Sequence, residues 1–91
     1  MFTVYAMYSM VDGRIYVGFT SDVNKRVKQH NSGVTKSTKG YRPWKMFYSE
    51  PVETREEARI REKYLKSGIG KEFLKSYLER MNFEIREPSE K

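Results

Sequence analysis

The chain contains no cysteine and only one histidine among its 91 residues. The absence of cysteine excludes disulfide bonds, cysteine-ligated zinc and iron–sulfur clusters, and a single histidine excludes a metal site built from histidines alone. A catalytic metal ion would therefore rest on carboxylates. Long apolar runs are also missing: the longest stretch without a charged residue, Met1–Val11, is too short to cross a bilayer and has neither a basic n-region nor a small-residue cleavage site. We expect one soluble, cytoplasmic domain that does not bind membranes.

The net charge of +6 is confined to one segment of the chain. Residues 1–20 and 49–91 each carry equal numbers of basic and acidic side chains, whereas residues 21–48 hold seven basic residues against Asp22 alone. A polyanion is the natural partner of such a segment, because binding phosphates releases condensed counterions. The alternative is a solvated surface that keeps a small protein soluble. With Tyr41 and Trp44 interleaved, we expect nucleic-acid phosphates to contact Lys25, Lys28, Lys36, Lys39, Arg42 and Lys45.

The sequence predicts an α+β fold, a three-stranded antiparallel sheet flanked by helices in the order ββαβαα. Ser21 is the expected N-cap of the first helix, Gly33 follows its end, and Thr54 with Glu57 forms a capping box at the second. The expected elements are strands Phe2–Met10 and Arg14–Thr20, helix Asp22–Asn31, a polar loop Thr35–Pro43, strand Trp44–Ser49, and helices Arg55–Ser67 and Lys71–Met81. We expect a single domain over residues 1–81 and a C-terminal tail over residues 82–91.

The two N-terminal strands predict a hairpin with one apolar and one more polar face. If Asp12-Gly13 is a two-residue turn, Tyr5 lies opposite Thr20, and Tyr5 and Tyr16 share the polar face with Gly18, which leaves room for a ligand. This register separates the backbones of the two tyrosines by roughly 13 Å, so their hydroxyls meet only if the side chains lean together or the register shifts. The alternative is a pair of ordinary strand tyrosines with solvated hydroxyls.

Three further side chains have the chemistry of a phosphate-cleaving site. Arg26 and His30 lie four residues apart on one helix face, where a guanidinium can hold a phosphate and an imidazole can exchange a proton. Glu62 lies on the inward stripe of the second helix, so its carboxylate needs a partner such as a metal ion, an arginine or a hydrogen-bond network. A structural salt bridge, for example to Arg26, is the alternative for Glu62.

The motifs, in this order, resemble the GIY-YIG nuclease superfamily. The first motif corresponds to Thr3-Val4-Tyr5 and the second to Tyr16-Val17-Gly18. The stretch D-V-N-K-R-V-K-Q-H-N is similar to the arginine helix of the family, with Arg26 and His30, and E-A-R-I-R-E-K-Y-L-K is similar to its metal helix, with Glu62. The resemblance is closest to small stand-alone bacterial members related to the nuclease domain of the excision-repair endonuclease.

This resemblance implies an endonuclease that hydrolyses nucleic-acid phosphodiester bonds with one divalent cation, Mg²⁺ or Mn²⁺, in DNA repair or processing. The sequence itself names no substrate, and we expect DNA ahead of RNA. The resemblance also implies that Glu62 binds the metal, that Tyr5 or Tyr16 is the general base, that Arg26 stabilises the transition state, and that His30 positions the phosphate or relays a proton.

Three positions depart from the family pattern: Thr3 replaces the glycine, Phe19 replaces a lysine of some relatives, and no asparagine lies in Lys71–Leu78. These departures leave two alternatives, a non-catalytic nucleic-acid-binding module with a protein partner that supplies specificity, and a structural accessory of a ribonucleoprotein.

Overall fold

The computed structural model describes the backbone of residues 1–90 and the side chains of residues 1–81. Its three antiparallel strands lie in the order β2-β1-β3. This arrangement confirms the predicted α+β fold and its ββαβαα order, and it adds a one-turn helix, α2, inside the predicted polar loop. The elements are β1 (Phe2–Ser9), β2 (Ile15–Thr20), α1 (Val23–Ser32), α2 (Lys36–Lys39), β3 (Trp44–Val52), α3 (Arg55–Lys66) and α4 (Gly68–Glu90).

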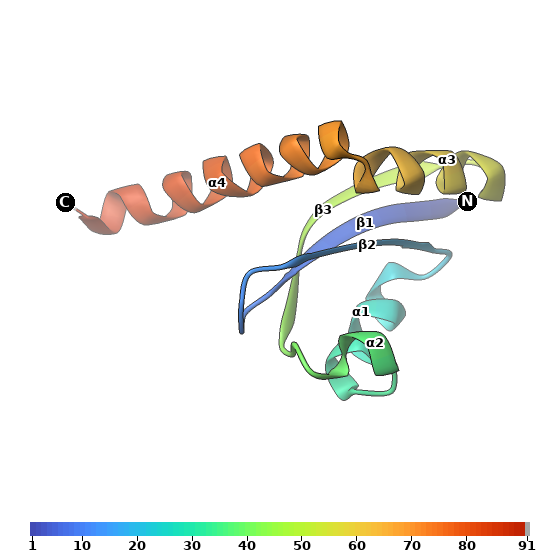
Figure 1. Ribbon diagram of the computed structural model, residues 1–91, viewed down its shortest axis with the longest axis horizontal. Helices are drawn as coiled ribbons and strands as arrows, with labels where there is room; N and C mark the ends of the chain where they lie inside the picture. Colours follow the sequence, from blue (N-terminus) through green and yellow to red (C-terminus); the bar gives the residue numbers. More distant parts are fainter. Residues whose placement is uncertain (91) are drawn as a thin grey trace.

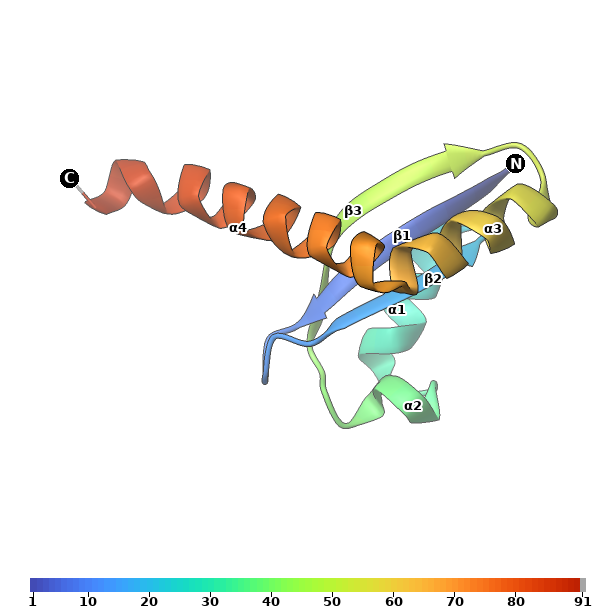
Figure 2. The same cartoon turned by 45° about the horizontal axis from the view of Figure 1, so that its top comes forward.

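Helices cover both faces of the sheet (Figures 1 and 2). On one face, α3 and the start of α4 enclose an apolar core that contains Val4, Ala6, Val17, Phe47, Ala58, Leu65 and Leu74. On the other face, α1 and α2 enclose a second cluster of Tyr5, Met7 and Trp44. The face predicted to be polar and accessible is therefore a second core, because α1 packs over it. The Asn31 side chain fastens α1 to β3, donating to the Trp44 carbonyl oxygen over 3.0 Å and accepting from the Trp44 amide.

The helix termini follow the sequence signals with corrections at α1 and α4. The last helix was predicted over Lys71–Met81, and α4 has the bounds Gly68–Glu90 because it begins directly after Ser67, the C-cap of α3. Thr54 and Glu57 form the predicted capping box of α3, and Gly33 ends α1 in the left-handed conformation (φ 88°). The N-cap of α1 is Asp22 rather than Ser21, because the Asp22 carboxylate accepts a hydrogen bond from the Lys25 amide over 3.1 Å. The expected tail, residues 82–91, lies outside the residues whose side chains are described. Within residues 1–90, no helix combines the length and the apolar character needed to cross a bilayer.

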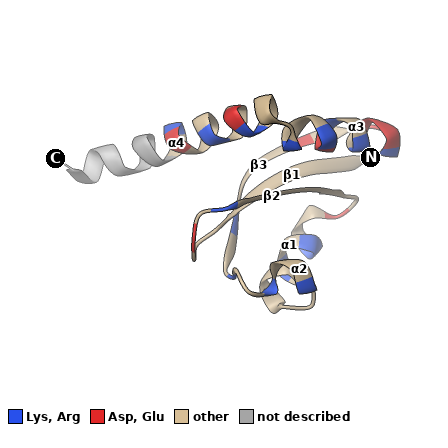
Figure 3. Cartoon of the chain, in the orientation of Figure 1, with Lys and Arg blue, Asp and Glu red and all other residues tan. Residues whose placement is uncertain are grey.

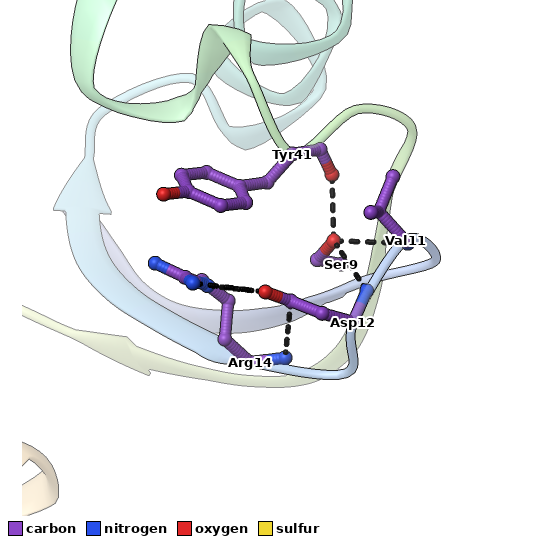
Figure 4. Close-up of polar contacts among 5 residues, drawn as sticks. All are labelled: Ser9, Val11, Asp12, Arg14 and Tyr41. Atoms are coloured by element: carbon purple, nitrogen blue, oxygen red, sulfur yellow. Dashed lines mark hydrogen bonds and ion pairs between the residues drawn. The ribbon is translucent and has the colours of Figure 1, made fainter.

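The β1–β2 register differs from the prediction by two residues. Tyr5 lies opposite Gly18 and Met7 opposite Tyr16, because the turn contains four residues rather than two. The buried Ser9 hydroxyl holds this longer turn: it accepts from the Val11 and Asp12 amides (3.0 and 3.3 Å) and donates to the Tyr41 carbonyl oxygen (2.7 Å; Figure 4).

The Asp12 carboxylate completes the turn through the Arg14 amide and guanidinium, and the Arg14 guanidinium lies 3.6 Å from the centre of the Tyr41 ring. A shift of two residues preserves the strand faces, and it brings Tyr5 and Tyr16 together.

Candidate active site

A buried chain of hydrogen bonds joins β1, α1 and α2. The Tyr5 hydroxyl and His30 Nε2 are 2.9 Å apart, and His30 Nδ1 lies 2.9 Å from the Thr38 hydroxyl. Thr38 donates its own proton to the Thr35 carbonyl oxygen over 3.3 Å. His30 Nδ1–H therefore donates to Thr38, and the bare Nε2 accepts from Tyr5. Because all three side chains are almost fully buried, the chain fixes the positions of the Tyr5 and His30 rings.

Gly18 is required by the position of Tyr5. A Cβ atom at residue 18 would lie 2.9 Å from the Tyr5 hydroxyl oxygen and 3.1 Å from a carbon of the Tyr16 ring. The space above the glycine, which the sequence analysis assigned to a ligand, is thus filled by the two phenol side chains. Because residue 18 is glycine, the rings of Tyr5 and Tyr16 can pack against its backbone.

Tyr16 is the more accessible of the two phenols. Its ring centre lies 4.9 Å from that of His30, 6.4 Å from that of Tyr5 and 6.1 Å from that of Trp44. Tyr16 is half-buried, whereas Tyr5 is 1% exposed. A ligand that approaches this side of the sheet therefore meets Tyr16 first.

Arg26 lies beside the buried chain and at the wall of a surface hollow. Its guanidinium donates to the Gln29 side-chain oxygen over 3.0 Å. The hollow is lined by residues 20–22 together with Lys25, Arg26 and Gln29. Lys25 and Arg26 thus face an open surface that the carboxylate-bearing Asp22 also lines. The two cations suit a phosphate group.

The neighbouring charges shift the pKa values of the buried groups. Burial, and then Tyr16, raise the pKa of Tyr5 to about 12; Arg26 opposes this rise and the Glu62 charge adds to it. Burial, and then the Arg26 charge, lower the pKa of His30 to about 4. At neutral pH both side chains are uncharged, which agrees with a hydroxyl that donates and an imidazole nitrogen that accepts. The same effects show that Arg26 and Glu62 lie within electrostatic reach of Tyr5.

Glu62 has a lysine as its partner rather than Arg26. Its Oε2 atom lies 2.9 Å from Lys66 Nζ, one helical turn away, and the two side chains are 23% and 54% exposed. No group of three acidic, histidine or cysteine side chains within residues 1–81 is close enough to form a metal site. A single carboxylate suits a hydrated Mg²⁺, which keeps several waters and takes further oxygen ligands from substrate phosphates. The donor chemistry of Glu62 therefore fits a divalent cation bound together with a phosphate.

The predicted basic residues are all exposed, and they occupy the surface formed by α1, α2 and the start of β3 (Figure 3). We call this surface the α1–α2 patch; it consists of Lys25, Lys28, Lys36, Lys39, Arg42 and Lys45. Trp44 and Tyr41, the aromatic residues interleaved with these cations in the sequence, make other contacts. Trp44 is buried and its indole N–H donates to the Thr38 carbonyl oxygen over 2.8 Å, and Tyr41 packs on Arg14. Trp44 is therefore not free to stack on a nucleobase, and the Arg14 guanidinium lies over the ring of Tyr41.

The structure brings four of the five predicted catalytic residues into direct contact or adjacent positions: Tyr5, Tyr16, Arg26 and His30. Glu62 lies on α3, and its charge makes a small contribution to the raised pKa of Tyr5. Two further residues of the site, Thr38 and Lys66, were not predicted from the sequence. Lys66 carries a signal, since a lysine four residues after a glutamate commonly pairs with it on a helix. Thr38 carries none, because a threonine in a polar loop gives no indication that it will be buried under a helix.

The chain is similar to several known proteins. The family model of the GIY-YIG catalytic domain matches residues 1–75. UPF0213 proteins of Staphylococcus aureus, strains Mu3 and N315, are 46% identical to the chain over 57 residues, which cover 62% of this chain and 70% of theirs. The solution NMR structure of a UPF0213 protein from Bacillus halodurans is 36% identical, with a TM-score of 0.51 and coverage of 84% of both chains. The expected likeness to the excision-repair nuclease is a general one: it goes no further than the shared family model.

Proposed function

Because this chain belongs to the GIY-YIG family of catalytic domains, a nuclease superfamily, we propose that it is a divalent-metal-dependent endonuclease that cleaves DNA phosphodiester bonds during repair or processing. The observation that carries the proposal is the cluster of Tyr5, Tyr16 and His30 beside Arg26, on the same side of the sheet as the α1–α2 patch. Preorganised polar groups beside a cation are the kind of arrangement that stabilises charge developing in a transition state.

In this proposal the Tyr16 hydroxyl contacts the attacking water, and Tyr5 holds Tyr16 in position. Tyr5 is buried, has a pKa raised to about 12 and donates to His30, so it keeps its proton at neutral pH. Tyr16 is half-buried and packs against both rings. In this assignment His30 and Thr38 act through Tyr5 as positioning residues, and the role of His30 as a proton relay stays a prediction.

Arg26 and Glu62 handle the charge of the phosphate. The Arg26 guanidinium, at the wall of an open hollow, donates paired hydrogen bonds to phosphate oxygens, and it stabilises the extra negative charge of the transition state. Glu62 would hold the Mg²⁺ or Mn²⁺ ion, which when bound polarises the scissile phosphate and neutralises charge on the leaving oxygen. Lys66 balances the Glu62 charge in the structure, and this exposed side chain can move away.

The decisive experiment is a metal titration of cleavage with Glu62→Gln and a matched control. Glu56→Gln makes the same change on the same helix, at an exposed position in the first turn of α3. We expect Glu62→Gln to lower the cleavage rate by orders of magnitude and to retain DNA binding in EDTA, and Glu56→Gln to cleave like wild type. The substrates are labelled duplex, branched and single-stranded DNA, with RNA counterparts.

A second pair of variants tests the assignment of the phenols and the guanidinium. Tyr16→Phe should keep its thermal stability and lose cleavage, and Arg26→Lys should lose turnover more than binding because it keeps the charge and loses the bidentate fork. A binding module on a degenerate scaffold predicts no metal-dependent cleavage of any substrate by wild type, with unchanged DNA binding by Glu62→Gln. A ribonucleoprotein accessory predicts RNA binding that ignores metal.

A further inference from the structure

Residues 49–91 contain equal numbers of basic and acidic side chains, but the two kinds are not evenly distributed over the surface of the protein. The first turn of α3 carries Glu56 and Glu57, whereas Lys66 lies in its last turn. Two more lysines, Lys71 and Lys75, follow on α4. Figure 3 shows red at the start of α3, and blue interspersed with red around the junction of α3 with α4. The sequence sum therefore conceals a second cationic surface, on the side of the sheet opposite the α1–α2 patch.

This second surface borders a continuous groove along the free edge of β2. Because β2 is the outer strand of the sheet order β2-β1-β3, its outer edge has no strand partner within the described residues. One hollow is lined by residues 15–17 with Lys66 and Lys71, and a second by residues 13–15 with Lys71, Lys75, Leu78 and Glu79. The two hollows share Ile15 and Lys71, so they form one groove, here called the β2-edge groove.

The lysines of the β2-edge groove are available to an anion. Lys71 and Lys75 are exposed, and neither forms an ion pair with a residue of the described part of the chain. They lie four residues apart on α4, where like charges repel each other. Lys66 already pairs with Glu62, and Glu79 is the one carboxylate among the described residues that line the groove. A bound polyanion would remove the repulsion between the two free lysines.

Tyr16 connects this groove to the candidate active site, because it lines the groove and also packs against Tyr5 and His30. We propose that the β2-edge groove binds backbone phosphates of the nucleic-acid substrate, as a second contact surface in addition to the α1–α2 patch. The substrate then lies across Tyr16 with cationic surfaces on both sides of it. The inference rests on the nucleic-acid partner of the proposed function and does not depend on cleavage.

The test is the salt dependence of DNA binding in EDTA, measured by fluorescence anisotropy with a labelled duplex. The variant is Lys71→Gln with Lys75→Gln, and the control is Arg59→Gln with Lys63→Gln, which removes the same charge from two exposed positions, also four residues apart, on α3. Each lost phosphate contact lowers the steepness of log Kd against log salt by about 0.9. We expect a decrease of about 1 to 2 in the groove variant relative to the control. Equal slopes in the two variants, or a wild type that does not bind, would overturn the proposal.

Lysine footprinting of the wild-type protein provides a measurement that does not depend on folding of a variant. Amine acetylation followed by mass spectrometry should show that bound duplex protects Lys66, Lys71 and Lys75, while Lys63, exposed on α3, is acetylated at the same rate with and without DNA. If bound duplex protects all four lysines equally, the proposal that the β2-edge groove binds DNA is wrong. The proposed endonuclease activity is tested separately: it is contradicted if Glu62→Gln leaves metal-dependent cleavage unchanged. That result would not change the salt dependence of DNA binding, on which the groove proposal depends.

Discussion

Acid should destabilise this protein through its only histidine, at a pH where carboxylates still carry their charge. Burial and the Arg26 charge lower the pKa of His30 to about 4, whereas an unfolded chain leaves it near 6.5. Between these values the unfolded state binds more protons, so the free energy of unfolding falls as the pH falls. Glu50 and Asp12 have pKa values below their ordinary ones, so their contributions are lost only at lower pH. The window from pH 7.5 to 5 therefore isolates His30.

The two pKa values give the size of the effect. Linkage predicts a loss of about 2 kcal/mol in the free energy of unfolding between pH 7.5 and 5, a large fraction of the stability of a domain of this size, which is on the order of 5 to 10 kcal/mol. Urea unfolding across this range, for wild type and His30→Gln, measures it. The Gln variant has lost the only imidazole, so its stability should be nearly independent of pH in this window, whatever its absolute stability.

NMR titration provides a direct check on the folded protein. The single imidazole gives one set of ring proton signals, and these should titrate near pH 4 rather than 6.5. Arg26→Gln removes the second cause of the shift and should raise the pKa partway. An imidazole that titrates above pH 6, or equal pH slopes for wild type and His30→Gln, would refute the assignment of a buried, neutral His30 that accepts from Tyr5.

Three further substitutions test the packing. Gly18→Ala should lower the thermal midpoint, at a cost of about 1 to 3 kcal/mol, because the new Cβ atom would lie 2.9 Å from the Tyr5 hydroxyl; an unchanged midpoint would contradict this contact. Thr38→Val should cost about 1 to 3 kcal/mol, since it leaves the buried Nδ1–H of His30 without an acceptor, and the alternative is a neutral change in urea unfolding. Val17→Asp should abolish folding, as judged by circular dichroism, because residue 17 is 5% exposed in the apolar core.

The hairpin shows which features of the fold could be predicted from sequence. Alternation of side chains assigned Val4 and Val17 to one face and Tyr5 and Tyr16 to the other, and both assignments are confirmed. The register was wrong by two residues because the turn is set by Ser9, whose hydroxyl bonds to Tyr41, 32 residues away. A local turn signal such as Asp-Gly does not contain such a contact.

The candidate site shows the same division. Motif spacing placed Tyr5, Tyr16, Arg26 and His30 on elements that do meet in the structure. It assigned Tyr5 and Tyr16 equal status, whereas packing of α1 buries one phenol and leaves the other partly exposed. Burial depends on the side chains above a residue, and these come from distant parts of the chain.

The sequence by itself determined the element order, the capping box of α3, the strand faces and the excess of positive charge in residues 21–48, because each depends on residues close together in the chain. Tertiary structure alone decided that Tyr5, His30 and Thr38 form one buried hydrogen-bonded chain, that Lys66 is the partner of Glu62, and that the lysines of α3 and α4 gather along β2. The physical reason is that burial, hydrogen bonding and charge act over distances in space, and a sum over the sequence contains none of these distances.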